Sequence, residues 1–251
     1  MVSLFVYLLF LFAFFFPKWK KRITFAAMKQ ILKTLSVYII AYLLLLMVVI
    51  GLLYAYPKVE LHLWLNACHS AVLDVFFKYY STFAEWLVYV LAVLPLFWKK
   101  KMMTFFFALS ELSAAVFVQI LKRLFSAPRP IVVFEDYPDL TLPLVQGVDL
   151  HHSNSFPSGH TSTFFVFFTC LAIILACHYL QRAQSNNLRS WMLFSGGMLL
   201  LLVLAALGGY SRIYLSQHFM MDVCVGSIIG FVSPFLVFYF GRKKVFKLEN
   251  V

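Results

Sequence analysis

The sequence predicts an all-α fold, a polytopic membrane helix bundle with six core transmembrane helices and an extra N-terminal apolar segment. Composition is the first observation: of 251 residues, 63% are hydrophobic and 12% are charged, whereas soluble domains carry about 25% charged residues. Second, several apolar segments reach the roughly 17–25 residues that cross a bilayer as a helix. Third, the basic residues cluster between alternate segments, as they do in membrane proteins. Together these observations exclude an ordinary soluble domain.

The six predicted spans are apolar stretches with polar or basic residues near their ends. They cover approximately residues 33–56, 82–98, 102–122, 161–181, 190–210 and 218–240. The second span is short and contains Glu85 and Pro95, so it departs most from the apolar pattern. We expect the spans to form one domain over residues 33–240, followed by a cytoplasmic tail over residues 241–251.

Residues 1–32 precede this domain as an apolar segment and a basic linker. The apolar part, MVSLFVYLLFLFAFFF, lacks the basic start and the small-residue cleavage site of a secretory signal peptide. As a helix it would be roughly 24 Å long at about 1.5 Å per residue, which is short for a span. A short extra span and an interfacial helix both remain open for this segment.

The basic residues indicate how the spans are oriented. Fifteen of the 21 Lys and Arg residues precede the first span, follow the sixth, or lie between the second and third or the fourth and fifth spans. If the six spans alternate, all fifteen lie on one side of the membrane, which the positive-inside rule identifies as cytoplasmic. The net charge of +11 therefore reflects membrane orientation, and we expect no nucleic-acid partner.

Three polar stretches fall on the opposite, outer side of the membrane. They are KRLFSAPRP (residues 122–130), HHSNSFPSGHTS (residues 151–162) and SRIYLSQHFMMD (residues 211–222). Each lies where predicted spans begin or end, and each contributes cationic or imidazole groups. We therefore expect the three stretches to converge on one pocket near the outer membrane interface.

Several groups in these stretches are suited to binding an anion. Lys122, Arg129 and Arg212 supply three positive charges, and planar guanidinium groups match the oxygens of a phosphate. Ser158 and Gly159 lie at a predicted helix N-terminus, where free N–H groups and the helix dipole favour an anion. Taken singly, the basic residues could be interfacial anchors that snorkel to headgroups. The stretch around Ser158 could equally be an ordinary helix start.

The third stretch adds a nucleophile and its partner. Asp222 follows His218 by four residues, so the two side chains share one face of a helix. An ionisable residue within a span is costly and is usually paired for a purpose. With Asp222 on one ring nitrogen, the other nitrogen of His218 can attack phosphorus. His160 is then free to protonate the departing alkoxide.

The pattern K-x6-RP, PSGH and SR-x5-H-x3-D resembles the signature of the type-2 phosphatidic acid phosphatase family, which is related to the vanadium haloperoxidases. The matching residues are Lys122, Arg129, Pro130, Pro157, Ser158, Gly159, His160, Ser211, Arg212, His218 and Asp222. The resemblance covers roughly residues 35–240 and implies a six-span phosphatase that needs no metal or cofactor. It implies a phosphohistidine on His218, with His160 as acid and then base. The residues implied to hold the phosphate are Lys122, Arg129, Ser158, Gly159 and Arg212.

A site at the interface can accept a headgroup while the tails of a lipid stay in the bilayer, so we expect a lipid phosphate as substrate. Phosphatidylglycerophosphate, undecaprenyl diphosphate, phosphatidate and the phosphates of lipid A are the candidates. The compact chain and outward-facing site favour a bacterial inner membrane and a periplasmic active site. A lipid phosphotransferase with the same intermediate is the nearest alternative. An anion transporter would also gather cations, but near the midplane and often in two repeated halves.

Two groups of polar residues have alternative interpretations. His151 and His152, with His160, could form a zinc site, but no acidic or cysteine ligand lies at a regular spacing. Headgroup contact and an ordinary solvated loop are the other interpretations. Ser153 and Ser155 are expected to cap turns ahead of the PSGH motif.

Within the spans, one acid and two glycine pairs stand out. Glu111 in the third span is either a functional residue or the partner of a Ser or Tyr on a neighbouring span. Gly226 and Gly230 form a small-xxx-small pair suited to close helix packing. Gly208 and Gly209 are expected to permit a sharp exit of the chain towards Arg212.

Overall fold

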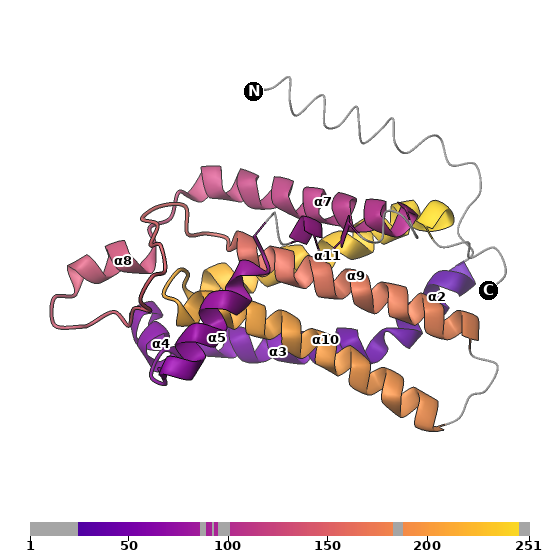
Figure 1. The fold of residues 1–251 in the computed structure, drawn as a ribbon, viewed down its shortest axis with the longest axis horizontal. Coiled ribbons are helices and arrows are strands. Elements are labelled where there is room, and N and C mark those ends of the chain that lie inside the picture. Colours follow the sequence, from indigo (N-terminus) through magenta and orange to yellow (C-terminus); the bar gives the residue numbers. More distant parts are fainter. Residues whose placement is uncertain (1–24, 86–88, 92, 95–100, 183–187, 246–251) are drawn as a thin grey trace, which may run out of the picture.

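A computed structural model of the chain describes residues 25–85, 89–91, 93–94, 101–182 and 188–245. Every regular element in these residues is a helix (Figure 1). In chain order they are α2 (Phe25–Thr34), α3 (Ser36–Ala55), α4 (Lys58–Leu65), α5 (Ala71–Thr82), α7 (Lys101–Phe125), α8 (Pro130–Val133), the 3-10 helix η1 (Phe134–Asp136), α9 (Gly159–Arg182), α10 (Leu188–Tyr214) and α11 (Met220–Val245). The predicted all-α fold is confirmed.

Five of the described helices are long and apolar enough to cross a membrane. They are α3, α7, α9, α10 and α11, which match the predicted first, third, fourth, fifth and sixth spans. The predicted second span lies only partly within the described residues, because residues 86–88, 92 and 95–100 fall outside them. The apolar segment over residues 1–16 and residues 246–251 of the predicted tail also fall outside. The chain is thus a multi-pass helical membrane protein.

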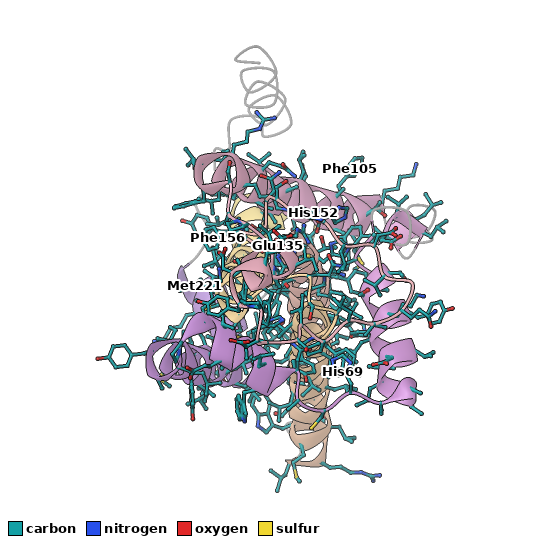
Figure 2. The ribbon with its side chains drawn as sticks, turned by 90° about the vertical axis from the view of Figure 1, so that its left-hand side faces the viewer. His69, Phe105, Glu135, His152, Phe156 and Met221 are labelled. Carbon is teal, nitrogen blue, oxygen red and sulfur yellow. The ribbon has the colours of Figure 1, made fainter. Side chains whose placement is uncertain are left out.

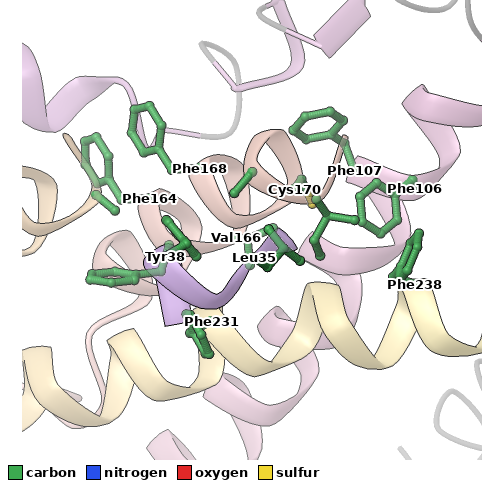
Figure 3. Packing of buried hydrophobic residues seen from close by; sticks show 14 of the residues in the cluster. Leu35, Tyr38, Phe106, Phe107, Phe164, Val166, Phe168, Cys170, Phe231 and Phe238 are labelled. Atoms are coloured by element: carbon green, nitrogen blue, oxygen red, sulfur yellow. The ribbon is translucent and has the colours of Figure 1, made fainter. Parts of the chain in front are cut away.

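Helix α9 occupies the centre of the bundle, where it packs against α7, α10 and α11. Its sequence is apolar or small on every side, as expected of a helix surrounded by other helices. Phe164, Val166 and Cys170 of α9 are fully buried, and Figure 3 shows them among rings that include Phe106 and Phe231. This core fixes α9 between its neighbours, and with it the polar stretch at the start of the helix.

The glycine pair in α11 allows that helix to approach α9 closely. A Cβ atom on Gly226 would lie 2.5 Å from the carbonyl oxygen of Ser158, and one on Gly230 would overlap the carbonyl oxygen of Ser162. Neither position has room for a side chain, so the predicted small-xxx-small contact is confirmed. The contact sets the first turns of α11 directly beside the start of α9.

The glycine pair in α10 does not do what the sequence predicted. Helix α10 continues through Gly208 and Gly209 to Tyr214, so the expected sharp exit is wrong. A Cβ atom on Gly208 would collide with the ring of Phe164, and one on Gly209 would press on Val223. The glycines are needed because neighbouring side chains fill the space beside the helix.

Helices α4, α5 and α8 gather at one end of the bundle, on the left in Figure 1, and α2 lies towards the opposite end. Helices α7 and α10 end there, while α9 and α11 begin there. All three polar stretches therefore lie at this end. Figure 2 looks onto it, with His152 and Phe156 near the centre of the view.

Candidate active site

The structure brings the cationic and imidazole groups of the three stretches together. Helices α7, α9 and α10 and the turn that leads into α11 each contribute. The groups close enough to His160 for electrostatic interaction are Arg212, His218, Lys122 and Arg129. The three stretches therefore come together at the end of the bundle that Figure 2 faces. That they line one pocket stays a prediction, because only the first two of them contribute residues to the pocket found there.

Arg129 connects the first stretch to the other two. It lies immediately before α8 and is 7% exposed. Its Nε donates to the carbonyl oxygen of Ser153 at 3.0 Å. Its Nη1 donates to the backbone and side-chain oxygens of Gln217 at 3.2 and 3.0 Å. A guanidinium has five N–H donors, and these three bonds use three of them. The two N–H groups on Nη2 have no hydrogen-bond partner among the described residues and are available to a ligand.

The start of α9 is capped and still has donors to offer. Ser158 is fully buried, and its hydroxyl oxygen accepts hydrogen bonds from the Thr161 hydroxyl at 2.9 Å and the Thr161 N–H at 3.4 Å. The Ser158 N–H donates to the backbone carbonyl of Asp222 at 2.9 Å, which joins α9 to α11. The first N–H groups of the helix, on Gly159 and His160, point to no helical carbonyl. Free N–H groups at the start of a helix favour an anion.

His218, in the turn between α10 and α11, and Asp222, in the first turn of α11, form a buried pair. His218 is 1% exposed and Asp222 is 5% exposed. Nδ1 of His218 lies 3.5 Å from Oδ2 of Asp222. The same carboxylate oxygen accepts hydrogen bonds from the Phe219 N–H at 3.0 Å and the Ser155 hydroxyl at 2.5 Å. Because Nδ1 faces the carboxylate, Nε2 is the ring nitrogen that remains for chemistry.

His218 lies in the turn between the two spanning helices, and burial lowers its pKa below the ordinary value. The charged imidazolium would lose its hydration in this position. The hydrogen bond with Asp222 opposes the shift, whereas the nearby charges of Arg129 and Arg212 add to it. Burial therefore favours the neutral imidazole, which keeps the lone pair that a nucleophile needs.

Arg212 has a donor that the surrounding protein does not satisfy. The residue lies near the end of α10 and is 7% exposed. Its Nε is buried without a hydrogen-bond partner among the described residues. A buried N–H that forms no hydrogen bond costs free energy, and an anionic oxygen would satisfy it. The backbone carbonyl of Arg212 accepts the N–H groups of Gln217 and His218 at 3.0 and 3.1 Å, so the guanidinium and the imidazole share one turn.

A pocket of about 620 Å³ opens beside the cations. The residues that line it are Gln119, Lys122, Arg123, Arg129, Leu150, His151, His152, Ser153 and Asn154. Lys122, half-buried at the end of α7, and Arg129 are shared with the predicted phosphate-binding group. The exposed loop over residues 151–154 forms the remaining side. The pocket is therefore largely polar and basic, and Arg129, which binds Gln217, connects it to the turn that contains His218.

Two residues belong to this arrangement although the sequence did not assign them to it. Ser155, expected to cap a turn, donates its hydroxyl to Asp222 and lies 3.4 Å from Nδ1 of His218. Gln217 accepts two hydrogen bonds from Arg129. Their positions in the sequence, close to the PSGH motif and directly before His218, are the available signals. Sequence position alone does not show that Ser155 would bind Asp222 or that Gln217 would bind Arg129.

The other polar candidates fall outside the His218 arrangement. Thr163 donates its hydroxyl to Oε1 of Glu111 at 2.7 Å, so the acid joins α7 to α9 through a Thr rather than a Ser or Tyr. His151 and His152 are exposed and line the pocket. Among the residues that the structure describes, no group of three or more His, Cys, Asp or Glu side chains could hold a metal ion.

Comparison with known proteins adds a family and several relatives. A family model described as the PAP2 superfamily matches residues 103–246. The chain is 29% identical over 170 residues to the Bacitracin transport permease protein BcrC of Bacillus licheniformis, which corresponds to 65% of this chain and 70% of that protein. It is 31% identical over 156 residues to the Probable diacylglycerol pyrophosphate phosphatase 1 of Schizosaccharomyces pombe. That match covers 57% of this chain and 53% of the yeast protein, about half its length.

Two solved structures share the fold. The crystal structure of Aquifex aeolicus LpxE superposes with a TM-score of 0.55 at 27% identity, covering 75% of this chain and 97% of that one. The first transmembrane PAP2 type phosphatidylglycerolphosphate phosphatase from Bacillus subtilis gives a TM-score of 0.55 at 19% identity, covering 85% and 98%. The second likeness concerns the fold alone.

Proposed function

This chain belongs to the PAP2 superfamily, and we propose that it is a membrane phosphatase that hydrolyses a lipid phosphomonoester or diphosphate. One observation carries the proposal. Nδ1 of His218 lies 3.5 Å from Oδ2 of Asp222, and the charges of Arg129 and Arg212 are close to its ring. The same two arginines and Lys122 lie near His160 in the first turn of α9. A nucleophile, fixed positive charges and helix N–H groups are the parts that phosphoryl transfer requires.

In the first step, the lone pair on Nε2 of His218 attacks phosphorus. The bond between phosphorus and the lipid oxygen breaks, and its electron pair goes to that oxygen. Protonated His160 gives the leaving oxygen its proton, because an alkoxide is a poor leaving group without one. Asp222 balances the positive charge that develops on the imidazole, as the carboxylate of a catalytic triad does.

In the second step, water attacks the phosphohistidine. His160, now neutral, takes a proton from the water, the phosphorus–nitrogen bond breaks, and phosphate leaves. In both steps the negative oxygens are held by Lys122, Arg129 and Arg212 and by the start of α9 at Ser158 and Gly159. Since these groups supply the positive charge, we propose that the reaction needs no metal ion or cofactor.

We infer that the substrate lies with its tails in the bilayer and its headgroup in the basic pocket beside Lys122. The pocket, of about 620 Å³, has room for more than one phosphate group. The candidates are phosphatidylglycerophosphate, undecaprenyl diphosphate, phosphatidate and lipid A phosphates. The name of the diacylglycerol pyrophosphate phosphatase relative supports a lipid phosphate as the substrate class.

The test is phosphate release by the purified full-length protein in detergent with each of these lipids. We expect release from at least one of them. A folded protein that releases phosphate from none would refute the proposal. An alcohol acceptor added to the same assay separates hydrolysis from the phosphotransferase alternative, because a transferase would form the phosphorylated acceptor in place of free phosphate.

We further propose that the site faces the periplasm of a bacterial inner membrane, which the distribution of basic residues supports. In a variant with the exposed Cys68 replaced by Ser, Asn154→Cys should react with a membrane-impermeant thiol reagent in intact spheroplasts. Asn186→Cys, in the connection between α9 and α10, should react only after lysis. Labelling of position 186 but not 154 in intact spheroplasts would place the site on the cytoplasmic side.

A further inference from the structure

A second buried imidazole lies just behind the turn that contains His218. His62, on the short helix α4, is 1% exposed and belongs to none of the motifs. Its ring lies edge-on to Phe219 at 5.1 Å and to Phe134 at 5.8 Å between centroids. Aromatic packing alone would not require a histidine here. The contacts of its nitrogens show what the imidazole adds.

Counting protons fixes the tautomer of His62. The Ser216 hydroxyl donates to the carbonyl oxygen of Pro143 at 2.6 Å, so towards Nε2 of His62, 3.2 Å away, it can only accept. The Asn66 amide also lies 3.3 Å from Nε2, but its two hydrogens go to the carbonyl oxygens of His62 and Ile213. The proton is therefore on Nε2. Burial lowers the pKa of His62 to about 4, so this neutral donor persists at pH 7.

The group that receives this hydrogen bond has an unfavourable backbone conformation. Ser216 has a φ of 50°, which glycine adopts far more readily than serine. Its N–H donates to the carbonyl oxygen of Ile213 at 2.9 Å, and the Gln217 N–H donates to that of Arg212 at 3.0 Å. This is the Schellman pattern that ends a helix. Here the usual glycine is replaced by a serine whose hydroxyl contacts α4.

The turn that α4 holds contains the groups of the proposed site. Arg212 lies at the start of this turn, and the His218 N–H donates to its carbonyl oxygen. Gln217, in the same turn, accepts a hydrogen bond from Arg129. On the far side of His218, Nζ of Lys58 lies 3.9 Å from the centroid of the Phe219 ring. Helix α4 thus contacts the chain immediately before and immediately after the nucleophile.

We propose that His62, through its hydrogen bond to Ser216, is a positioning residue that holds the His218 turn in its reactive geometry. The imidazole does not touch substrate. It fixes the backbone from which His218 and Arg212 project, so that Nδ1 stays against Asp222 and Nε2 faces the phosphate. This inference rests on the proposed phosphatase function.

The test compares three variants on one helix, with wild-type turnover measured first. His62→Phe keeps an aromatic ring between Phe134 and Phe219 but removes the donor. His62→Gln restores an N–H at a similar reach. Glu60→Gln, at an exposed position of α4, is the matched control. Since a misplacement of about 1 Å can cost about 100-fold in rate, we expect kcat of His62→Phe to fall at least about tenfold with an unchanged KM. His62→Gln should recover most of the loss, and Glu60→Gln should match the wild type.

Inhibition separates positioning from general disruption of the site. Vanadate mimics the five-coordinate phosphorus of the transition state, and phosphate mimics the product. In His62→Phe, vanadate inhibition should weaken by the same factor as kcat/KM, while phosphate inhibition should stay near the wild-type value. Equal weakening of both, or a loss that His62→Gln does not recover, would overturn the proposal.

Two further variants cover the case in which His62→Phe does not fold. Ser216→Ala removes the hydroxyl, and Ser216→Gly removes it while relieving the positive φ. Both should lose kcat in the same way, and full activity in folded Ser216→Gly would overturn the proposal. Full activity in folded His62→Phe would do the same. If the wild type releases no phosphate, the proposed function is wrong. If the wild type is active and the His62 and Ser216 variants keep its kcat, only the positioning role of His62 is wrong.

Discussion

The two sides of the proposed site are held very differently. The histidine side, residues 211–219, is buried at every position. Its backbone and side chains are bonded to α4, Arg129 and Asp222. The loop side, residues 151–154, is exposed at all four positions and lines an open pocket. The proposed bond-breaking groups thus lie where the geometry is fixed, while the loop proposed to meet the headgroup is exposed, as adaptable binding segments usually are.

The largest effect should come from the centre of the histidine side. We expect His218→Ala to lower kcat by at least about 10⁴-fold, because it removes the nucleophile itself. Asp222→Asn should keep a small residual rate, since it disturbs the orientation and charge of the imidazole but leaves Nε2 in place. Phosphate release measured on folded, monodisperse protein checks both. Near-normal release by His218→Ala would remove His218 from the mechanism.

The motif residues could be predicted because each depends on local sequence. The sequence placed His218 and Asp222 on one helix face, but α11 begins at Met220, so His218 lies in the turn before the helix and this detail was wrong. The two side chains still meet, with 3.5 Å between Nδ1 and Oδ2, because only three residues separate them. The spans were predicted from apolar length, and five of them correspond to described helices. The sharp exit at Gly208 was wrong because a glycine for close packing and a glycine for a turn look alike in a sequence.

The remaining contacts could not be predicted because they join distant parts of the chain. Ser155 meets Asp222 across 67 positions, and His62 meets Ser216 across 154. No periodicity relates such pairs, and each depends on how α9, α10 and α4 pack. Helix α4 itself has eight residues, too short for the span pattern that found the other helices.

Ser155 tests whether the histidine side extends beyond its motif. Its hydroxyl is one of three donors to Oδ2 of Asp222, with the Phe219 N–H and Nδ1 of His218. A hydrogen bond to a charged group contributes about 1.5–3 kcal/mol, so we expect Ser155→Ala to lower kcat by about tenfold or more. Ser153→Ala, two residues earlier on the exposed loop, is the control and should leave kcat unchanged. An equal kcat for Ser155→Ala and Ser153→Ala would contradict the distinction between the buried histidine side and the exposed loop side.

The loop side should give smaller, substrate-dependent effects. His151 and His152 line the pocket but make no hydrogen bond to His218 or Asp222 within the described residues. Exposed polar contacts contribute about 1 kcal/mol or less, so His151→Ala with His152→Ala should raise KM a few-fold for a substrate with a second phosphate. Phosphatidate, which has a single phosphate, serves as the control substrate and should show little change. A large fall in kcat for both lipids would move the loop into the chemistry.

The smallest expected effect is that of a chelator. Lys122, Arg129 and Arg212 lie close to one another and are proposed to supply the positive charge around the phosphate. EDTA should therefore leave phosphate release unchanged, and vanadate should still inhibit. The experiment is run on the wild type and on the double variant of His151 and His152. If EDTA abolished activity and zinc restored it in the wild type alone, the histidines of the loop would be metal ligands. Residues 151–154 would then take part in the reaction itself and not only in binding the headgroup. The distinction between the two sides would no longer hold, and Arg129, which contacts both Ser153 and Gln217, would join two parts of one catalytic centre.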